Sequence, residues 1–215
     1  MILAGIRTFS FVDYPRRISS VVYTGGCNFR CQWCHNWKIA YANEYKVISE
    51  DEMLDRLKFL RARISAVCIT GGEPTIHNDL IEFVKQVKDM EYMIKIDTNG
   101  TNPDMIYKLI EQNLIDYVAV DIKAKPENYS RLVNVYGRYW ESISETIKIL
   151  RTSNIEYEFR MTYVPGLSSQ DDIDFFEEFL VEGERAYITV ANSTEIFKIK
   201  SRRSKRMKIK RLIFR

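Results

Sequence analysis

The sequence predicts an α/β fold: an open parallel sheet made of six strand–helix units. Short apolar runs rich in β-branched residues alternate with segments of helical periodicity, which is typical of repeated βαβ units. At ~30 residues per unit, the 215 residues suffice for six units, whereas an eightfold barrel typically needs ~250 residues. We therefore expect an open parallel (βα)6 partial TIM-type barrel with a basic C-terminal tail.

Six segments have the apolar, β-branched character of buried strands. They are residues 18–24, 66–70, 93–98, 116–122, 156–164 and 186–191. In open parallel sheets, ligands bind at the carboxyl ends of the strands. The loops that follow these strands are therefore where we expect functional residues.

Five segments between the strands have apolar residues at helical spacing. The first helix follows Ser49, which forms a capping-box pattern with Glu52. The second begins near residue 78, the third has Asn102 as cap and Pro103 in its first position, the fourth spans about 139–152, and the fifth follows Ser169. The faces expected to pack on the sheet are Met53, Leu57, Leu60 and Ile64; Leu80, Phe83, Val84 and Val87; Ile106, Leu109 and Ile110; Ile143, Ile147 and Leu150; and Ile173, Phe176, Phe179 and Leu180.

The composition is that of a globular chain, with 46% hydrophobic and 28% charged residues. This excludes a collagen-like, wholly disordered or disulfide-dense protein. No run of ~18 apolar residues predicts a membrane span, and the first residues lack the layout of a signal peptide. We therefore expect a cytoplasmic protein with no membrane partner.

The basic residues are distributed unevenly. Ten of the 32 lie in residues 198–215, which contain no acidic residue, so residues 1–197 carry 22 basic against 29 acidic side chains. The expected division is a core domain over 1–197 and a basic C-terminal extension over 198–215. Such an extension could contact nucleic acid or an acidic partner, but a solvated, poorly ordered extension is favoured.

Three of the four cysteines lie in the loop after the first predicted strand. Cys27, Cys31 and Cys34 have the spacing C-x3-C-x2-C and are followed by His35. This pattern leaves open a Cys3His zinc site, a C-x-x-C-H haem attachment, or a [4Fe–4S] cluster with one iron free of protein ligands. Haem attachment is disfavoured because it normally accompanies export. The fourth cysteine, Cys68, is expected to be a buried core residue.

Polar residues also follow the next three strands. Gly71-Gly72-Glu73 combines glycines that permit close backbone approach with a carboxylate that could bind an ammonium group. Asp97-Thr98 ends the third strand. Asp121 and Lys123 end the fourth, and residues two apart on a strand point the same way. Together these sets predict one site at the carboxyl edge of the sheet.

This combination of motifs closely resembles the radical S-adenosylmethionine (SAM) enzymes, and among them the glycyl-radical-enzyme activating enzymes. Residues 11–15 (Phe-Val-Asp-Tyr-Pro) and residues 24–36, which hold the cysteine motif and a following His-Asn, resemble the anaerobic ribonucleoside-triphosphate reductase activating protein group. The pyruvate formate-lyase activating enzyme is also similar. The resemblance spans residues 2 to about 166.

The resemblance implies a role for each matched residue. Cys27, Cys31 and Cys34 would bind three irons of a [4Fe–4S] cluster, and SAM would chelate the fourth. The implied SAM contacts are Trp33, His35, Gly71, Gly72, Glu73, Asp121 and Lys123. Asp97 and Thr98, with Asp121, match a monovalent-cation site; Asp13 matches a contact to the glycyl peptide, and Arg160 matches an arginine of the cavity.

The resemblance also implies an oxidoreductase of anaerobic metabolism. A reduced cluster would pass one electron into the SAM sulfonium, giving methionine and a 5′-deoxyadenosyl radical, and that radical would take hydrogen from a glycine of a partner glycyl radical enzyme. The motifs favour anaerobic ribonucleotide reductase as this partner. A low-potential donor of the flavodoxin or ferredoxin type would reduce the cluster. The alternatives are a radical SAM enzyme acting on a small molecule or RNA base and, from another class, a zinc-binding module.

Overall fold

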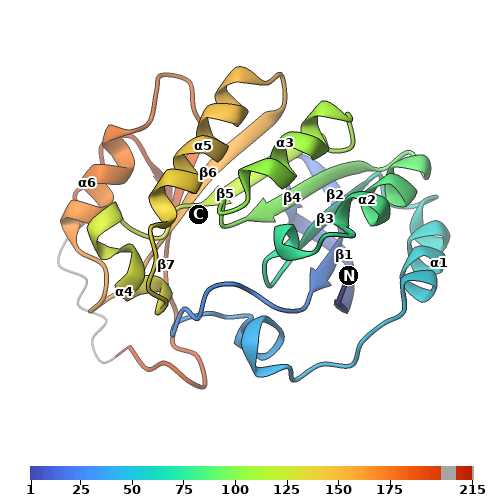
Figure 1. The fold of residues 1–215 in the computed structure, drawn as a ribbon, viewed down its shortest axis with the longest axis horizontal. Coiled ribbons are helices and arrows are strands. Elements are labelled where there is room, and N and C mark those ends of the chain that lie inside the picture. The colour runs from blue at the N-terminus through green and yellow to red at the C-terminus, as the bar shows by residue number, and fades with distance from the viewer. Residues whose placement is uncertain (200–206, 215) are drawn as a thin grey trace.

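The structure is a computed structural model that describes residues 1–199 and 207–214. One eight-stranded sheet runs through it, and the order of the strands in space follows their order in the chain. Figure 1 shows the sheet curled into a half-barrel, with helices along its outer side. The expected partial α/β barrel is therefore confirmed.

Besides the two-residue β8 (Ile213–Phe214), six strands of this sheet are parallel: β2 (Arg17–Thr24), β3 (Ala66–Gly71), β4 (Met93–Thr98), β5 (Tyr117–Asp121), β6 (Glu156–Tyr163) and β7 (Ala186–Val190). They match the six predicted strands to within one residue at each end. Because all six run in the same direction, their carboxyl ends share one edge of the half-barrel.

The helices are α1 (Glu50–Leu60), α2 (Leu80–Asp89), α3 (Pro103–Glu111), α4 (Tyr129–Val133), α5 (Tyr139–Thr152) and α6 (Gln170–Glu178). The predicted caps are present: Ser49 accepts the N–H of Glu52, and the Asn102 side chain accepts the N–H of Met105. The predicted apolar faces are buried, except that Ile110 and Phe179 are only partly buried. No helix within residues 1–199 and 207–214 is long and apolar enough to cross a membrane.

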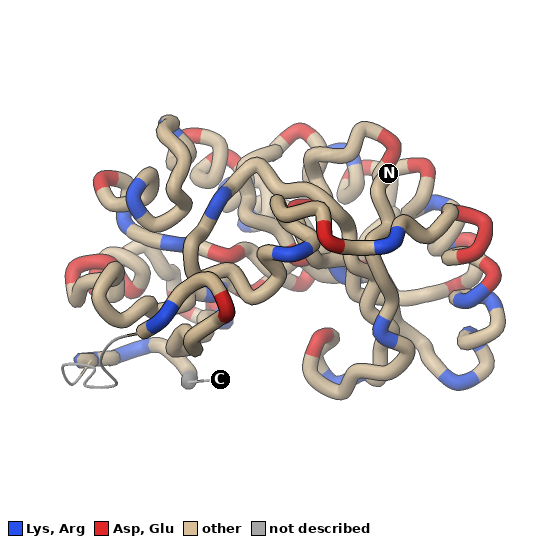
Figure 2. The backbone as a smooth tube through the Cα atoms, turned by 90° about the horizontal axis from the view of Figure 1, so that it is seen from below, with Lys and Arg blue, Asp and Glu red and all other residues tan. Residues whose placement is uncertain are grey.

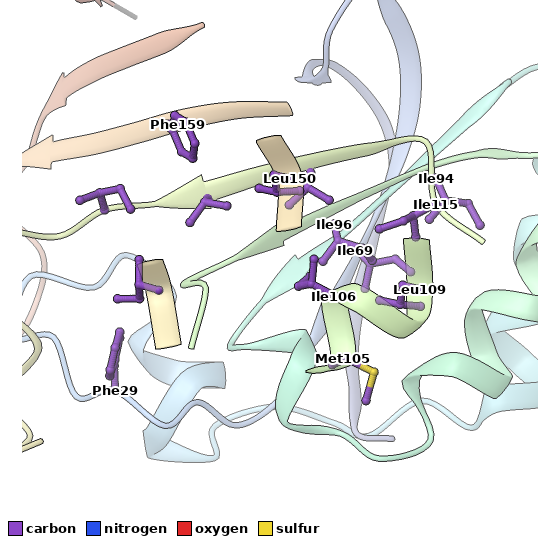
Figure 3. Close-up of a cluster of buried hydrophobic side chains, with 14 of the residues drawn as sticks. Phe29, Ile69, Ile94, Ile96, Met105, Ile106, Leu109, Ile115, Leu150 and Phe159 are labelled. Carbon is purple, nitrogen blue, oxygen red and sulfur yellow. The ribbon is translucent and has the colours of Figure 1, made fainter. Parts of the chain in front are cut away.

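The hydrophobic core lies between the sheet and the helices (Figure 3). Ile69, Ile94 and Ile96 project from β3 and β4 toward Ile106 and Leu109 of α3, and all five side chains are fully buried. Because side chains alternate along a strand, the residues between these isoleucines face the interior of the half-barrel. The inner face is therefore free to carry polar residues.

Strand β1 (Leu3–Tyr14) was not predicted by the sequence patterns. It pairs antiparallel with β2 at the edge of the sheet, and its register shifts between Leu3 and Gly5, between Arg7 and Ser10, and again before Tyr14. These irregularities break the alternation of apolar and polar residues that identifies a strand. Helix α4 and strand β8 (Ile213–Phe214) were also not predicted. The helix has little more than one turn and the strand has two residues, so neither shows a periodic pattern.

Residues 207–214 return to the body of the protein (Figure 2). The backbone N–H groups of Lys210 and Arg211 both donate to Glu177 Oε1, at 2.6 and 2.9 Å, and β8 then pairs parallel with β7. Met207, Ile209 and Leu212 pack against the core. The expectation of a solvated extension is therefore wrong for these residues, because a buried acid and apolar contacts hold them. Residues 200–206 and 215 lie outside the described residues.

We predict that Asp172→Asn lowers the free energy of unfolding by about 1–3 kcal/mol, the cost of disrupting buried hydrogen bonds to a charged group. Asp172 is fully buried and accepts hydrogen bonds from the backbone of Lys125 (3.1 Å) and Ser169 (2.8 Å) and from Asn128 (3.0 Å). Urea denaturation measures the change.

The matched control is Asp171→Asn, which removes the same charge from the same helix turn. The Asp171 side chain is 72% exposed, so this change should stay within about 0.5 kcal/mol of wild type. Equal effects of the two substitutions on the free energy of unfolding would contradict the stabilising role assigned to the buried hydrogen bonds of Asp172.

Candidate functional site

A cavity of about 220 Å³ opens at the carboxyl ends of the parallel strands. Its walls bring together the residues that the sequence motifs singled out: Cys27, Cys31, Cys34, Trp33, His35, Gly71, Gly72, Glu73, Asp97, Thr98, Asp121 and Lys123. These residues come from the carboxyl ends of four different strands and from the loops that follow them. The structure therefore brings the predicted residues together around one cavity at this edge of the sheet.

Several further residues line the cavity that sequence reasoning missed. They are Phe29, Asn36, Ala40, Thr70, Asn99 and Thr162. Asn36 and Asn99 lie directly beside the recognised motifs, and Thr162 is a polar residue near the carboxyl end of β6. The rule that identified the other loops would have identified Thr162 too.

The turn after β2 and the turn after β3 are in direct backbone contact. The N–H of Gly72 donates to Thr24 O and the N–H of Glu73 donates to Gly26 O, both at 2.8 Å. A Cβ on Gly72 would lie 1.7 Å from Gly26 O. Gly71 has a φ of +113°, in the region that favours glycine, and a Cβ there would lie 2.6 Å from Thr24 N. Both glycines are thus required by contact between the two turns.

The cysteine loop is also fixed by local hydrogen bonds. The N–H of Cys34 and the hydroxyl of Tyr41 both donate to Cys31 O at 3.0 Å. Asn36 Nδ2 donates to Gly71 O at 3.1 Å. The loop that carries the three thiols is therefore joined to the Gly71–Gly72 turn by side chains as well as by backbone.

Burial raises the pKa of each thiol in this loop. It raises the pKa of Cys27 to about 12 and that of Cys31 to about 11, and the pKa of Cys34 also lies above its ordinary value. A metal ligand must be a thiolate, so binding a metal here would release protons.

Glu73 connects the turn after β3 to the turn after β4. Its side chain is 2% exposed; Oε1 accepts the hydroxyls of Thr75 (2.6 Å) and Thr98 (2.7 Å), and Oε2 accepts the N–H of Asn99 (2.7 Å). Burial raises the pKa of Glu73, and these hydrogen bonds oppose the shift. The carboxylate holds two walls of the cavity together, and Oε2 accepts one of the two hydrogen bonds that its lone pairs allow.

A chain of alternating charges crosses the inner face of the half-barrel. Lys95 Nζ donates to Asp97 Oδ1, and Arg160 Nη1 donates to Asp97 Oδ2 at 3.0 Å. Arg160 Nε donates to Asp121 Oδ1 at 2.8 Å, and Lys123 Nζ donates to Asp121 Oδ2 at 3.0 Å. Arg160 is therefore a positioning residue that bridges two acids of the cavity wall without lining it.

This network controls the charge of both acids. Burial alone would raise the pKa of Asp121, but Arg160 and Lys123 outweigh it and hold that pKa well below its usual range. Burial would also raise the pKa of Asp97, but Arg160 and Lys95 outweigh it, so that this pKa too lies below its ordinary value. A monovalent cation at Asp97, Thr98 and Asp121 would compete with these side chains for the same carboxylate oxygens.

Trp33 is one of the two aromatic residues that line the cavity. The side chain is 5% exposed, and its indole N–H is buried without a hydrogen-bond partner among the described residues. Lys123 Nζ lies 5.4 Å from the centre of its ring. A buried donor without an acceptor costs about 1–3 kcal/mol, so a ligand that supplies an acceptor here would be stabilised.

Asp13, Cys68 and the loop residue His77 lie apart from the cavity wall. Asp13, on β1, contacts Ser10 and lies 3.7 Å from Arg7. His77 Nε2 lies 2.9 Å from Gly25 O, which makes it a structural partner of the turn after β2. Cys68 is fully buried, as expected for a core residue. The structure therefore does not bring Asp13 to the cavity.

We predict that Gly72→Ala destabilises the chain by at least about 2 kcal/mol, because the added methyl group overlaps Gly26 O and the two turns must separate. Gly5→Ala on β1 is the matched control, since a Cβ there meets nothing closer than 3.9 Å. Thermal unfolding of both variants measures the difference. A well-folded Gly72→Ala protein as stable as Gly5→Ala would contradict the contact.

We also predict that Asp121→Asn lowers the free energy of unfolding at pH 7 by at least about 2 kcal/mol, because it leaves Arg160 and Lys123 without their shared counterion. The folded pKa of Asp121 is depressed, so its contribution is present above the unfolded value of about 3.9 and is lost as the pH falls below it. The stability difference from wild type should therefore shrink on acidification, whereas exposed Asp55→Asn should show little difference at any pH. A constant difference would contradict the assigned charge state.

Comparisons with known proteins identify the family. The model of the radical SAM superfamily matches residues 21–179. An inferred glycyl-radical enzyme activating enzyme of Methanocaldococcus jannaschii is 36% identical over 80% of this chain and 72% of its own length. The 7-carboxy-7-deazaguanine synthase of Thermoplasma acidophilum is 30% identical over 74% of this chain and 65% of its own. The pyruvate formate-lyase-activating enzyme of Listeria monocytogenes is 34% identical over 59% of this chain and 55% of its own.

A solved structure shares the fold. Streptococcus suis SuiB bound to S-adenosylmethionine matches 84% of this chain with a TM-score of 0.64 at 16% identity, and the match covers 43% of SuiB. At that identity the likeness concerns the half-barrel alone. The family match covers most of the chain and includes the cysteine loop and three of the cavity-forming turns. This chain belongs to the radical SAM superfamily.

Proposed function

We propose that this chain is a glycyl-radical enzyme activating enzyme, which takes a hydrogen atom from a backbone glycine of a partner protein. The observation that carries the proposal is the 36% identity, over 80% of the chain, to the M. jannaschii protein inferred to have this activity. The motif resemblance favours anaerobic ribonucleotide reductase as the partner. A donor of the flavodoxin or ferredoxin type completes the proposed set of partners.

The residues of the cavity fit the cofactors that membership of the superfamily implies, a [4Fe–4S] cluster and SAM. No three His, Cys, Asp or Glu side chains in the described parts of the chain stand close enough to enclose a single ion. A four-iron cluster makes a different demand, because each thiolate binds a separate iron. Three thiols on one loop that lines the cavity are a suitable donor set. Membership of the radical SAM superfamily therefore favours the iron–sulfur cluster over the zinc site and the haem attachment that the cysteine spacing left open.

We assign Cys27, Cys31 and Cys34 to the cluster. When bound and reduced, the cluster supplies the electron that cleaves SAM. For SAM itself, the vacant acceptor site on Glu73 Oε2 suits an ammonium group, and the Lys123 ammonium suits a carboxylate. The remaining SAM contacts in the proposal are Trp33, His35, Gly71, Gly72 and Asp121.

The open half-barrel supports a protein substrate. β1 and β8 are opposite edges of the sheet and do not pair, so the barrel is not closed. A backbone segment of a partner could enter from this side and reach the polar inner face. The relationship to 7-carboxy-7-deazaguanine synthase makes a small-molecule substrate the second candidate, to be separated by experiment.

We predict that Cys31→Ala abolishes both cluster binding and SAM cleavage after anaerobic reconstitution, because one iron loses its protein ligand. Cys68→Ala is the control, because Cys68 is fully buried and does not line the cavity. This variant should retain about four irons and the cleavage activity. Iron analysis and chromatography of the SAM products measure both. SAM cleavage by Cys31→Ala would contradict the cluster assignment.

The activase proposal itself is tested by incubating the reconstituted, reduced protein and SAM with an anaerobic ribonucleotide reductase and with a second glycyl radical enzyme. We expect a glycyl radical on one of them, detected by electron paramagnetic resonance. A partner variant with alanine in place of the radical glycine is the control. SAM cleavage without radical transfer to either protein would contradict the activase proposal and favour the small-molecule alternative.

A further inference from the structure

The same tripeptide, Arg-Ile-Ser, lies at the amino ends of two adjacent strands, at the edge of the sheet opposite the cavity. Arg17-Ile18-Ser19 opens β2 and Arg63-Ile64-Ser65 precedes β3, and Ser19 pairs with Ala66 in the parallel register. With Arg16 and Arg61, these arginines line a cleft of about 360 Å³ that has no acidic residue in its walls. Since residues 1–197 carry more acidic than basic residues, this concentration of arginine is not a property of the surface in general.

Part of the cleft is held in a fixed arrangement. Arg61 Nε donates to Met90 O at 2.7 Å and Nη2 donates to Glu91 O at 3.2 Å, while the guanidinium lies 5.4 Å from the ring centre of Tyr92. In contrast, the guanidinium groups of Arg17 and Arg63 have no hydrogen-bond or ion-pair partner in the described chain. Their donors are therefore available to a ligand.

The backbone around the cleft is strained. Among the residues that the structure describes, five non-glycine residues have positive φ, and three of them are asparagines, which tolerate it. The other two are Arg16 (φ 60°) and Glu91 (φ 61°). Arg16 lines the cleft, and the backbone carbonyl of Glu91 accepts a hydrogen bond from Arg61. Strain retained at residues that would be more stable as glycine or asparagine is a reason to look for function.

Ion pairing does not account for the four arginines. Arg16 lies 3.4 Å from Glu156, but both side chains are more than half exposed, and Arg61 lies 3.8 Å from an almost fully exposed Glu91 carboxylate. Exposed pairs of this kind contribute little to stability. Four neighbouring guanidinium groups repel one another unless an anion lies between them.

We propose that this arginine cleft, defined by Arg16, Arg17, Arg61 and Arg63, binds an oligophosphate group, either free or carried by a nucleotide. A guanidinium fork forms paired hydrogen bonds with phosphate oxygens, and several forks require an anion with several charges. A single carboxylate would neutralise only one of them. The site lies at the amino ends of the strands, away from the cavity, so it would act as a second ligand site and is independent of the proposed function.

Isothermal titration calorimetry of the full chain with inorganic triphosphate tests the proposal, with ATP in a second arm. We expect triphosphate to bind, and Arg17→Ala/Arg63→Ala to weaken it by at least about tenfold, because two sets of charge-assisted hydrogen bonds are lost. ATP should compete with triphosphate if the phosphates provide the contacts. SAM cleavage by the double variant should remain at the wild-type rate.

Lys108→Ala/Lys148→Ala, which removes two exposed charges from α3 and α5, is the matched control and should bind triphosphate as the wild type does. Equal weakening in both double variants, or unchanged binding in Arg17→Ala/Arg63→Ala, would overturn the proposal in favour of general charge attraction or of the basic C-terminal segment. No binding to the wild type would also overturn it.

Arg16→Gly separates ligand binding from stability. Glycine relieves the positive φ, so the melting temperature without triphosphate should stay the same or rise, while the triphosphate affinity falls. A loss of melting temperature with unchanged affinity would show that Arg16 is structural, and would overturn its place in the site.

Discussion

The site depends on the contact between two glycine-rich turns. Gly72 and Gly26 approach so closely that no side chain fits between them, and the hydrogen bonds across this contact fix the cysteine loop against the turn that carries Glu73. Glu73 then holds the turn after β4 through Thr98 and Asn99. The thiols and the polar groups of the cavity thus share one rigid frame, although they come from distant parts of the chain.

The second element of this frame is electrostatic. The chain of charges from Lys95 to Lys123 lowers the pKa of Asp97 and of Asp121, and so outweighs the effect of burial, which raises it. Arg160 is its centre, since it contacts both acids. This arrangement gives the inner face a fixed pattern of charge. It also places the Lys123 ammonium beside the ring of Trp33.

Local rules were sufficient for the parallel strands, the caps at Ser49 and Asn102, and the convergence of the cavity residues, because each follows from short-range periodicity and from the shared direction of the strands. They were insufficient where tertiary contacts decide. The shifted register of β1 hides its strand pattern, and residues 207–214 are held by Glu177, more than thirty positions earlier. The part played by Gly71 and Gly72 was predicted as ligand approach, whereas the structure also shows contact with a neighbouring turn, which no local pattern reveals.

The central claim is that three thiols and the polar cavity form one site in which SAM binds directly to the cluster. Electron–nuclear double resonance of the reduced protein, with SAM carrying 15N in its amino group, tests this most directly. The account predicts a hyperfine coupling between the labelled nitrogen and the cluster spin. Bound SAM with no such coupling would place its amino group away from the iron, and would contradict the account.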